Sequence, residues 1–291
     1  MKRRDFIKNA GLLSALTLTG NSFAATTGGG KLKSLKNFGL ITGNTGGEWL
    51  KENPKEGLKL IADLGYKELE FGGDFGLGVD YAKKYIKDLG LKPLCGGSSM
   101  YGIAIDKEAF KKSIETTQKW GMKYFVCYYP FLDGTQVVPL DQWKQIADWC
   151  NEAGRACKEA GLEFLYHNHD YEFQVTEGVI PFDIVLQNTD PNYVNVEMDL
   201  YWVTKGNADP ITYMKKYPGR FPVLHVKDMD YTPERNFADV GSGKIDFPEI
   251  FSYSKIAGTK HYMVEHDKPK NGKDSITASG NYLRNLKYRE R

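Results

Sequence analysis

A strand followed by a helix is the unit that repeats along this chain, and eight such units fill residues 36–286. Short apolar runs alternate with longer segments in which apolar residues recur at helical spacing. Several predicted helices end in glycine directly before the next strand, at Gly65, Gly90, Gly121 and Gly161. Glycine is the residue that most often follows a helix end. The repeat therefore predicts parallel strands joined by crossover helices.

The repeat predicts a closed barrel. The predicted strands are 37–42, 66–71, 92–95, 124–129, 162–167, 193–199, 222–226 and 261–265, and the predicted helices are 49–64, 80–89, 107–120, 140–159, 182–187, 210–217, 247–257 and 275–286. An open doubly wound sheet is the alternative, but its phosphate-binding G-x-G-x-x-G does not follow the first strand. We therefore predict an α/β fold consisting of a single (β/α)₈ TIM barrel over residues 36–291.

The first 25 residues differ from the rest. The paired Arg3 and Arg4 precede Asp5, then a mildly apolar run leads to the small residues Ala24 and Ala25. This order is typical of a twin-arginine export signal, which predicts a periplasmic or otherwise exported protein. A basic amphipathic helix is the alternative. Residues 26–35 are Gly- and Lys-rich and are predicted to be a flexible leader.

Composition argues against two kinds of partner and against a disulfide framework. The formal net charge of +2 predicts neither a nucleic-acid partner nor a membrane-surface partner for the mature protein. Cys150 and Cys157 are separated by about 10 Å along a predicted helix, which is too far to bridge. Cys95 and Cys127 lie in predicted strands, where they are expected to be core residues.

Polar side chains stand at the ends of the last four predicted strands. Asp199 ends one strand, His225 lies near the end of the next, and Glu265 ends the last. Barrel chemistry takes place where strands end, and neutral His with carboxylates suits a divalent metal of the Mn²⁺, Zn²⁺ or Co²⁺ type. His167 is the preferred fourth ligand, and Glu172 and His169 are the alternatives.

The polar stretches around these residues are similar to those of a known family. The sequences YHNHDYEF at 166–173, MDLYW at 198–202, VLHVKD at 223–228 and VE at 264–265 resemble the xylose isomerase-like TIM barrel superfamily. That superfamily includes sugar phosphate isomerases and epimerases, ketose 3-epimerases and inosose dehydratases. The resemblance covers about residues 36–286, and family members are often oligomers, which suggests a homo-oligomer here.

The resemblance implies a metal, often Mn²⁺, held by Glu, Asp, His and Glu from successive strands. Asp199, His225 and Glu265 match three of these ligands, whereas His167 stands where the family has its first Glu. This departure leaves open both the fourth ligand and the family's usual acid–base Glu. Zn²⁺, Co²⁺ and Mg²⁺ are alternatives to Mn²⁺.

Such a site would remove the proton next to a ketone and stabilise the resulting enediolate. With His167 in place of a Glu, a base on one side of the site, His169 or Glu172, suits isomerisation or elimination better than symmetric epimerisation. Lys227 shares a face with His225 and is expected to hold the enediolate charge, with an ion pair to Glu197 or Asp199 as the alternative. Glu265 doubles as a catalytic residue, and Glu70, Tyr201 and Trp202 are the predicted substrate-binding residues.

We therefore predict a metal-dependent isomerase or epimerase that acts on a small sugar or keto-sugar. The first alternative is a lyase, dehydratase-like or cleaving 3-keto-glycosides, that uses the same metal site. A second alternative is a sugar-binding barrel without catalysis. A metal-dependent endonuclease is disfavoured, because it calls for more His ligands and a basic groove.

Overall fold

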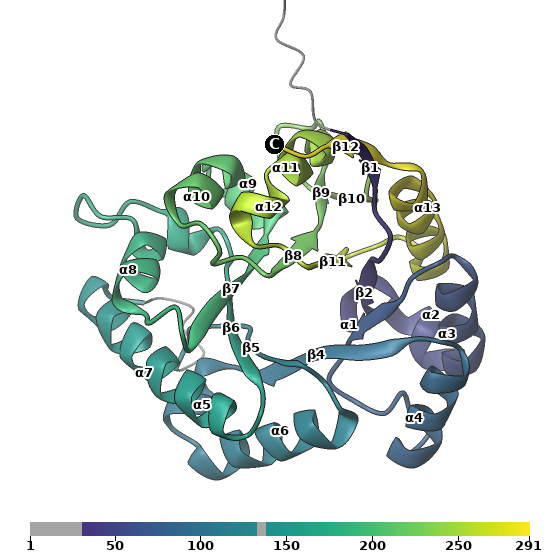
Figure 1. Ribbon diagram of the computed structural model, residues 1–291, viewed down its shortest axis with the longest axis horizontal. Helices are drawn as coiled ribbons and strands as arrows, with labels where there is room; N and C mark the ends of the chain where they lie inside the picture. Colours follow the sequence, from purple (N-terminus) through teal and green to yellow (C-terminus); the bar gives the residue numbers. More distant parts are fainter. Residues whose placement is uncertain (1–30, 133–137) are drawn as a thin grey trace, which may run out of the picture.

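The computed structural model describes residues 31–132 and 138–291, and within them eight parallel strands close into a barrel. The strands follow one another around the barrel in chain order, with the last strand pairing with the first (Figure 1). They are β2 (Gly39–Ile41), β3 (Glu68–Glu70), β4 (Lys92–Ser98), β5 (Tyr124–Cys127), β6 (Glu163–His167), β7 (Val194–Asp199), β8 (Val223–Val226) and β11 (His261–Val264). The predicted (β/α)₈ barrel is confirmed.

Helices surround the barrel on all sides (Figure 1). They include α3 (Pro54–Asp63), α4 (Val79–Asp88), α6 (Lys107–Trp120), α7 (Leu140–Glu159), α8 (Pro181–Asn188), α10 (Pro210–Lys216), α11 (Phe247–Ser252) and α13 (Gly272–Asn285). Gly121 ends α6 in the left-handed conformation, with φ 73°. This is the conformation that the sequence predicts for a glycine directly after a helix.

Two predicted helices are each divided in the structure. The segment predicted as one helix over 49–64 forms α2 (Gly47–Glu52) and α3, because Pro54 has no backbone N–H to continue the first helix. The segment 247–257 forms α11 and α12 (Ser254–Ala257), which meet at Tyr253.

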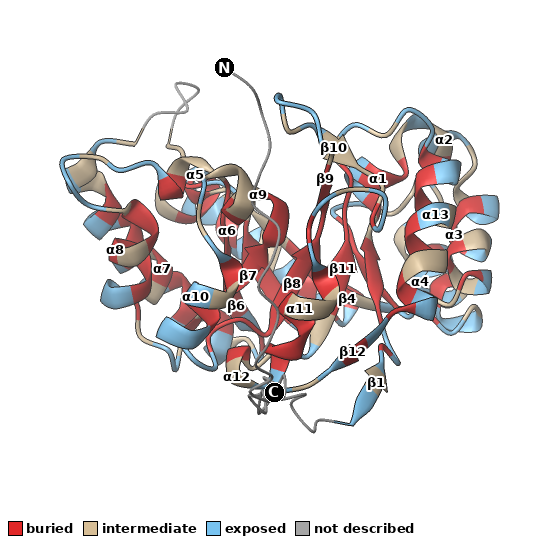
Figure 2. Ribbon diagram, turned by 90° about the horizontal axis from the view of Figure 1, so that it is seen from above, coloured by how far each residue is buried: buried red, intermediate tan, exposed pale blue. Residues whose placement is uncertain are grey.

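Part of the predicted leader is a strand. Leu32–Ser34 forms β1, which pairs antiparallel with β12 (Lys287–Arg289) near the end of the chain. Figure 2 shows this ribbon at the opposite end of the barrel from β9 (Asp228–Met229) and β10 (Phe237–Ala238). The prediction of a wholly flexible leader is wrong for residues 32–34, because their backbone groups pair with β12. The predicted export signal at 1–25 lies outside the described residues.

The loop between β8 and α11 is organised by one buried carboxylate. Asp228 accepts hydrogen bonds from the backbone N–H groups of Met229, Gly241, Gly243 and Ile245 at 2.8–3.2 Å. A Cβ on Gly243 would lie 2.4 Å from Asp228 Oδ1 and 2.2 Å from Met229 O, so only glycine fits there. The carboxylate thereby holds the loop against the end of β8.

The barrel interior is apolar at one level and polar above it. Leu94, Cys95, Tyr124, Val126, Leu165, Val223 and Met263 form an apolar cluster between the strands. Successive inward-facing residues lie two positions apart along a strand, so Val223 is followed toward the carboxyl ends of the strands by His225 in β8 and by Lys227 directly after β8. All four cysteines are free and buried.

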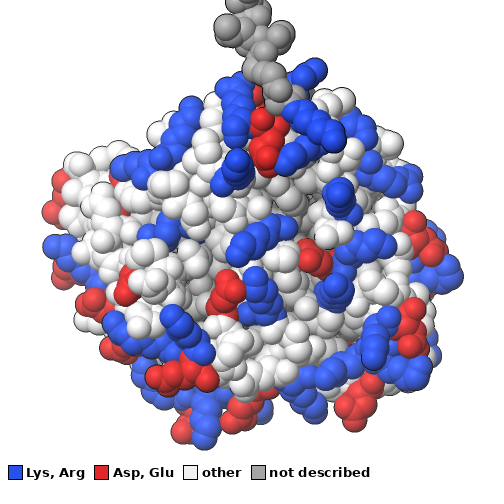
Figure 3. Space-filling model, in the orientation of Figure 1, with Lys and Arg blue, Asp and Glu red and all other residues white. Residues whose placement is uncertain are grey.

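The surface carries charges of both signs. Lys and Arg side chains are interspersed with Asp and Glu side chains over the face in Figure 3, consistent with the net charge of +2. Among the described residues, no helix combines the length and the apolar character that a membrane crossing requires.

Replacing Asp228 by Ala is expected to lower the free energy of unfolding by about 2–4 kcal/mol, because four backbone N–H groups lose a common acceptor. Urea unfolding followed by circular dichroism measures the change. Asp63→Ala is the control, since Asp63 forms only an exposed ion pair with Lys59 and its loss is expected to cost about 0.5 kcal/mol or less. Equal losses for the two variants would contradict this account of the loop.

Candidate active site

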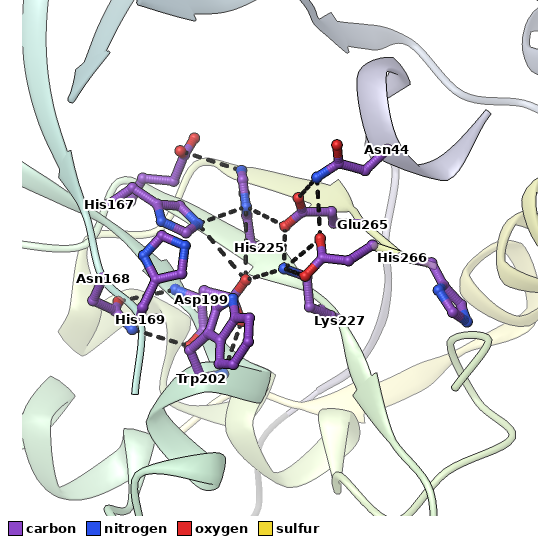
Figure 4. Close-up of polar contacts among 12 residues, drawn as sticks. Asn44, His167, Asn168, His169, Asp199, Trp202, His225, Lys227, Glu265 and His266 are labelled. Carbon is purple, nitrogen blue, oxygen red and sulfur yellow. Dashed lines mark hydrogen bonds and ion pairs between the residues drawn. The ribbon is translucent and has the colours of Figure 1, made fainter. Parts of the chain in front are cut away.

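Four side chains from four neighbouring strands meet at the carboxyl end of the barrel. His167 ends β6, Asp199 ends β7, His225 lies in β8 and Glu265 directly follows β11. Each offers one nitrogen or oxygen atom, these four atoms lie within 4.8 Å of one another, and all four residues are buried. Figure 4 shows the four side chains pointing toward a common centre. The structure thus brings together the residues that the sequence predicts as metal ligands, with His167 in the fourth position.

The spacing of this cluster fits a metal ion. Nδ1 of His225 lies 3.1 Å from Nε2 of His167, 3.0 Å from Glu265 Oε2 and 3.9 Å from Asp199 Oδ2. Ligands about 2.0–2.3 Å from a tetrahedral ion lie roughly 3.3–3.8 Å apart, so shifts of a few tenths of an ångström would bring these atoms to ligand spacing. Asp199 Oδ2 is buried and accepts no hydrogen bond of good geometry, and its close neighbour is the Lys227 ammonium at 3.0 Å, so its lone pairs still face the cluster. Two imidazoles and two carboxylates are a donor set that Zn²⁺, Mn²⁺ and Co²⁺ accept.

A pair of carboxylates lies on the other side of the His225 ring. Nε2 of His225 is 3.1 Å from Glu70 Oε2 and 3.2 Å from Glu197 Oε2. Burial and the nearby Glu70 raise the pKa of Glu197 to about 8. These carboxylates, together with Glu265, raise the pKa of His225 well above its usual value despite its burial. The two oxygens near Nε2 would accept its proton, and a metal at the cluster would take the place of the proton on Nδ1. Glu70, predicted to bind substrate, lines the cavity but is also part of this support.

Lys227 is the buried cation of the site. Its Nζ lies 3.0 Å from Asp199, 2.6 Å from Glu265 and 3.1 Å from Asp267. Burial alone would lower the pKa of Lys227, but these carboxylates raise it, so the ammonium form is retained. Of the two ion pairs predicted as alternatives for Lys227, the one with Asp199 is present. Glu197, the other predicted partner, lies next to His225 instead.

The two candidate bases are placed differently. His169 lines the cavity, and burial lowers its pKa well below the usual value, so the ring is neutral. Its Nδ1 lies 2.9 Å from the Tyr171 hydroxyl. Glu172 does not line the cavity. Its carboxylate accepts hydrogen bonds from the Tyr166 hydroxyl and from the His169 backbone N–H, so it holds the loop that carries His169.

The polar cluster opens into a cavity of about 740 Å³. Trp202, a predicted substrate-binding residue, lines it, and its ring lies 5.3 Å from that of His169. Tyr201 does not line the cavity: it is buried, and its hydroxyl donates to the backbone oxygen of Arg235. Tyr201 faces away because consecutive residues of α9 (Leu200–Lys205) point in different directions.

Sequence reasoning missed several cavity residues. Asp267 contacts Lys227, and the side-chain amide of Asn44 donates to both Glu265 and Asp267. Burial and the neighbouring Glu265 raise the pKa of Asp267 to about 6. Asp267 follows Glu265 by two positions, so the strand-end rule extended by one step could have found it. Tyr129 and Phe131, which follow β5, also line the cavity, and no polar motif pointed to them.

Comparison with known proteins agrees with this geometry. The model of the family "Xylose isomerase-like TIM barrel" matches residues 58–286. An inosose dehydratase of Geobacillus kaustophilus is 24% identical over 231 residues, covering 67% of this chain and 73% of that protein. Several other inosose dehydratases match over about half of their own length.

Solved structures give the same result. A sugar phosphate isomerase/epimerase from Parabacteroides distasonis is 28% identical with a TM-score of 0.73, covering 87% of this chain and 94% of that one. The IOLI protein, solved with a zinc atom, shares the fold at 17% identity with a TM-score of 0.64, covering 85% of this chain and 96% of that one. The family match spans most of the chain: this protein belongs to the xylose isomerase-like TIM barrel family.

Proposed function

We propose that this protein is a metal-dependent enzyme that removes the proton next to the ketone of an unphosphorylated keto-sugar or keto-polyol. The observation that carries the proposal is the convergence of His167, Asp199, His225 and Glu265 within 4.8 Å of one another beneath an open cavity. A divalent cation held there would polarise the ketone and make the neighbouring C–H more acidic. Mn²⁺ is our first choice, and the zinc atom of the IOLI protein makes Zn²⁺ the second.

The chain supplies one proton acceptor and one fixed cation. His169 is neutral and faces the cavity. When it donates Nδ1–H to Tyr171, Nε2 carries the lone pair that accepts a substrate proton. Lys227 is held in its charged form at the wall of the cavity, where it would stabilise the negative charge of the enediolate.

The site offers a proton acceptor on one side, and this argues against epimerisation by two bases. Glu265 contacts Lys227, His225 and Asn44, and its pKa lies well below the usual value because Lys227 and His225 outweigh its burial. Glu265 is therefore a poor second base, and two-base epimerisation is disfavoured. We favour elimination, as in the inosose dehydratases that this chain resembles. Isomerisation is the second candidate, supported by the likeness to a sugar phosphate isomerase/epimerase.

The protein loaded with Mn²⁺ is expected to exchange the α-protons of a keto-sugar with D₂O, and EDTA is expected to abolish the exchange. Nuclear magnetic resonance of fructose, an inosose and a 3-keto-glucoside measures the exchange and shows whether elimination or isomerisation follows. Asp199→Ala is expected to reduce the rate by at least about 100-fold, because the cluster loses a ligand. Asp63→Ala is the matched control. Sugar binding without any exchange would indicate the non-catalytic alternative.

The carboxylate pair beneath His225 is expected to strengthen metal binding. Replacing both Glu70 and Glu197 by Leu removes the acceptors of Nε2–H and is expected to weaken Mn²⁺ or Zn²⁺ binding by roughly 10- to 100-fold. Competition with a chelating dye measures the affinity. Glu68→Gln, which alters an ion pair with His261 elsewhere in the barrel, is expected to change it less than about twofold. Unchanged affinity in the double variant would rule out this supporting role.

We further propose that residues 1–25 direct export through the twin-arginine route. Replacing Arg3 and Arg4 by Lys is expected to keep the full-length protein in the cytoplasm, because that route requires the paired arginines. Fractionation of expressing cells measures the distribution. A periplasmic marker enzyme that is exported by another route is the control. Equal export of both forms would refute this proposal.

A further inference from the structure

We propose that Tyr129 and Phe131 form a binding subsite for a second ring, so that the substrate is a neutral glycoside rather than a single sugar or a sugar phosphate. The inference rests on the proposed function for one point only, the placement of the first sugar ring against the metal ligands. The rest follows from the shape, the aromatic lining and the charges of the cavity.

The first observation is an aromatic wall beside the polar cluster. Tyr129 and Phe131 line the same cavity as His167, His169 and Glu265. The ring of Tyr129 stacks against His169, with centroids 4.9 Å apart and planes at 24°, and lies 6.4 Å from the nearly parallel ring of Phe131. Tyr129 is nevertheless 48% exposed. One part of its ring is therefore fixed by neighbours while another part is open to a ligand.

The second observation is the size of the cavity. Its volume of about 740 Å³ corresponds to roughly 25 water molecules at about 30 Å³ each, whereas a hexose has only about twelve heavy atoms. Because covalently bonded atoms occupy less volume than separate water molecules, a single sugar ring seated at the metal ligands leaves more than half of the space unfilled. The unfilled part is bordered by aromatic side chains, which stack on sugar rings and on aryl rings alike.

The third observation is the charge of the lining. Among the described residues that line the cavity, the lysines are Lys227 and Lys268, and Lys227 already contacts three carboxylates. Glu70, Asp170, Glu265 and Asp267 also line it. With a divalent cation bound, the charges of these groups roughly cancel, so the lining offers a phosphate no excess of positive charge. Among the described residues that line the cavity there is also no arginine to bind a phosphate through two parallel hydrogen bonds. The lining therefore favours an uncharged ligand.

Isothermal titration of the Mn²⁺-loaded protein with non-reacting ligands tests the proposal. Phenyl β-glucoside, cellobiose, methyl β-glucoside and glucose 6-phosphate are compared. At least one of the two-ring ligands is expected to bind roughly three- to tenfold more tightly than methyl β-glucoside, and which of them does so distinguishes an aryl from a sugar second ring. Glucose 6-phosphate is expected to bind most weakly.

Three variants locate the effect. Tyr129→Ala is expected to remove the advantage of the two-ring ligand, and Tyr129→Phe, which keeps the ring, to preserve it. Tyr81→Ala is the control, because Tyr81 is similarly exposed, at 47%, but lies on the outer helix α4. Circular dichroism confirms that each variant is folded.

The proposal is overturned if methyl β-glucoside binds as tightly as both two-ring ligands, if neither two-ring ligand binds measurably, if glucose 6-phosphate binds best, or if Tyr129→Ala leaves the preference intact. Proton exchange on fructose, measured in parallel, separates the two levels of inference. Exchange without a two-ring preference refutes the subsite alone, whereas a two-ring preference without exchange with any keto-sugar refutes the proposed function alone.

Discussion

The contacts among Lys227, Asp199 and Glu265 are the interaction on which the site depends. Both carboxylates are buried, and burying a charge is costly unless an opposite charge accompanies it. The ammonium of Lys227 lies within 3.0 Å of both, so it balances part of this charge within the protein itself. A divalent cation would balance the rest. The cluster therefore keeps the carboxylates of Asp199 and Glu265 charged at a buried place, where they could bind a metal.

Barrel geometry brings these groups to one place. Asp199 pairs in register with His225 on the next strand, and His225 pairs with Met263, two residues before Glu265. Since inward-facing residues alternate along each strand, Glu265 lies one inward-facing position beyond Met263, as His225 lies one beyond Val223. The three polar side chains therefore converge above the apolar cluster that contains Met263 and Val223. The strands are short, so this polar level lies directly beneath the loops that form the cavity.

The pattern of strands and helices was readable from the sequence because each unit carries its own signals, such as the glycine that ends α6 and the apolar run of β5. Features that depend on one residue were also readable in principle. Pro54 divides a predicted helix for a local reason, the lack of a backbone N–H. The apolar spacing continues across Pro54, so this spacing alone predicts a single helix. In contrast, β1 pairs with β12 from the opposite end of the chain, and no local pattern in either segment indicates that pairing.

The sequence by itself determined the eight repeats and the positions of His167, Asp199, His225 and Glu265 at strand ends, because period and position along a strand are local properties. Only the tertiary structure decided how the remaining polar groups are used. Glu172 turns to Tyr166, Glu197 supports His225, and Asp267 joins Lys227. These choices depend on which side chains face one another across the barrel and at what height, and such distances are set only when all eight strands close.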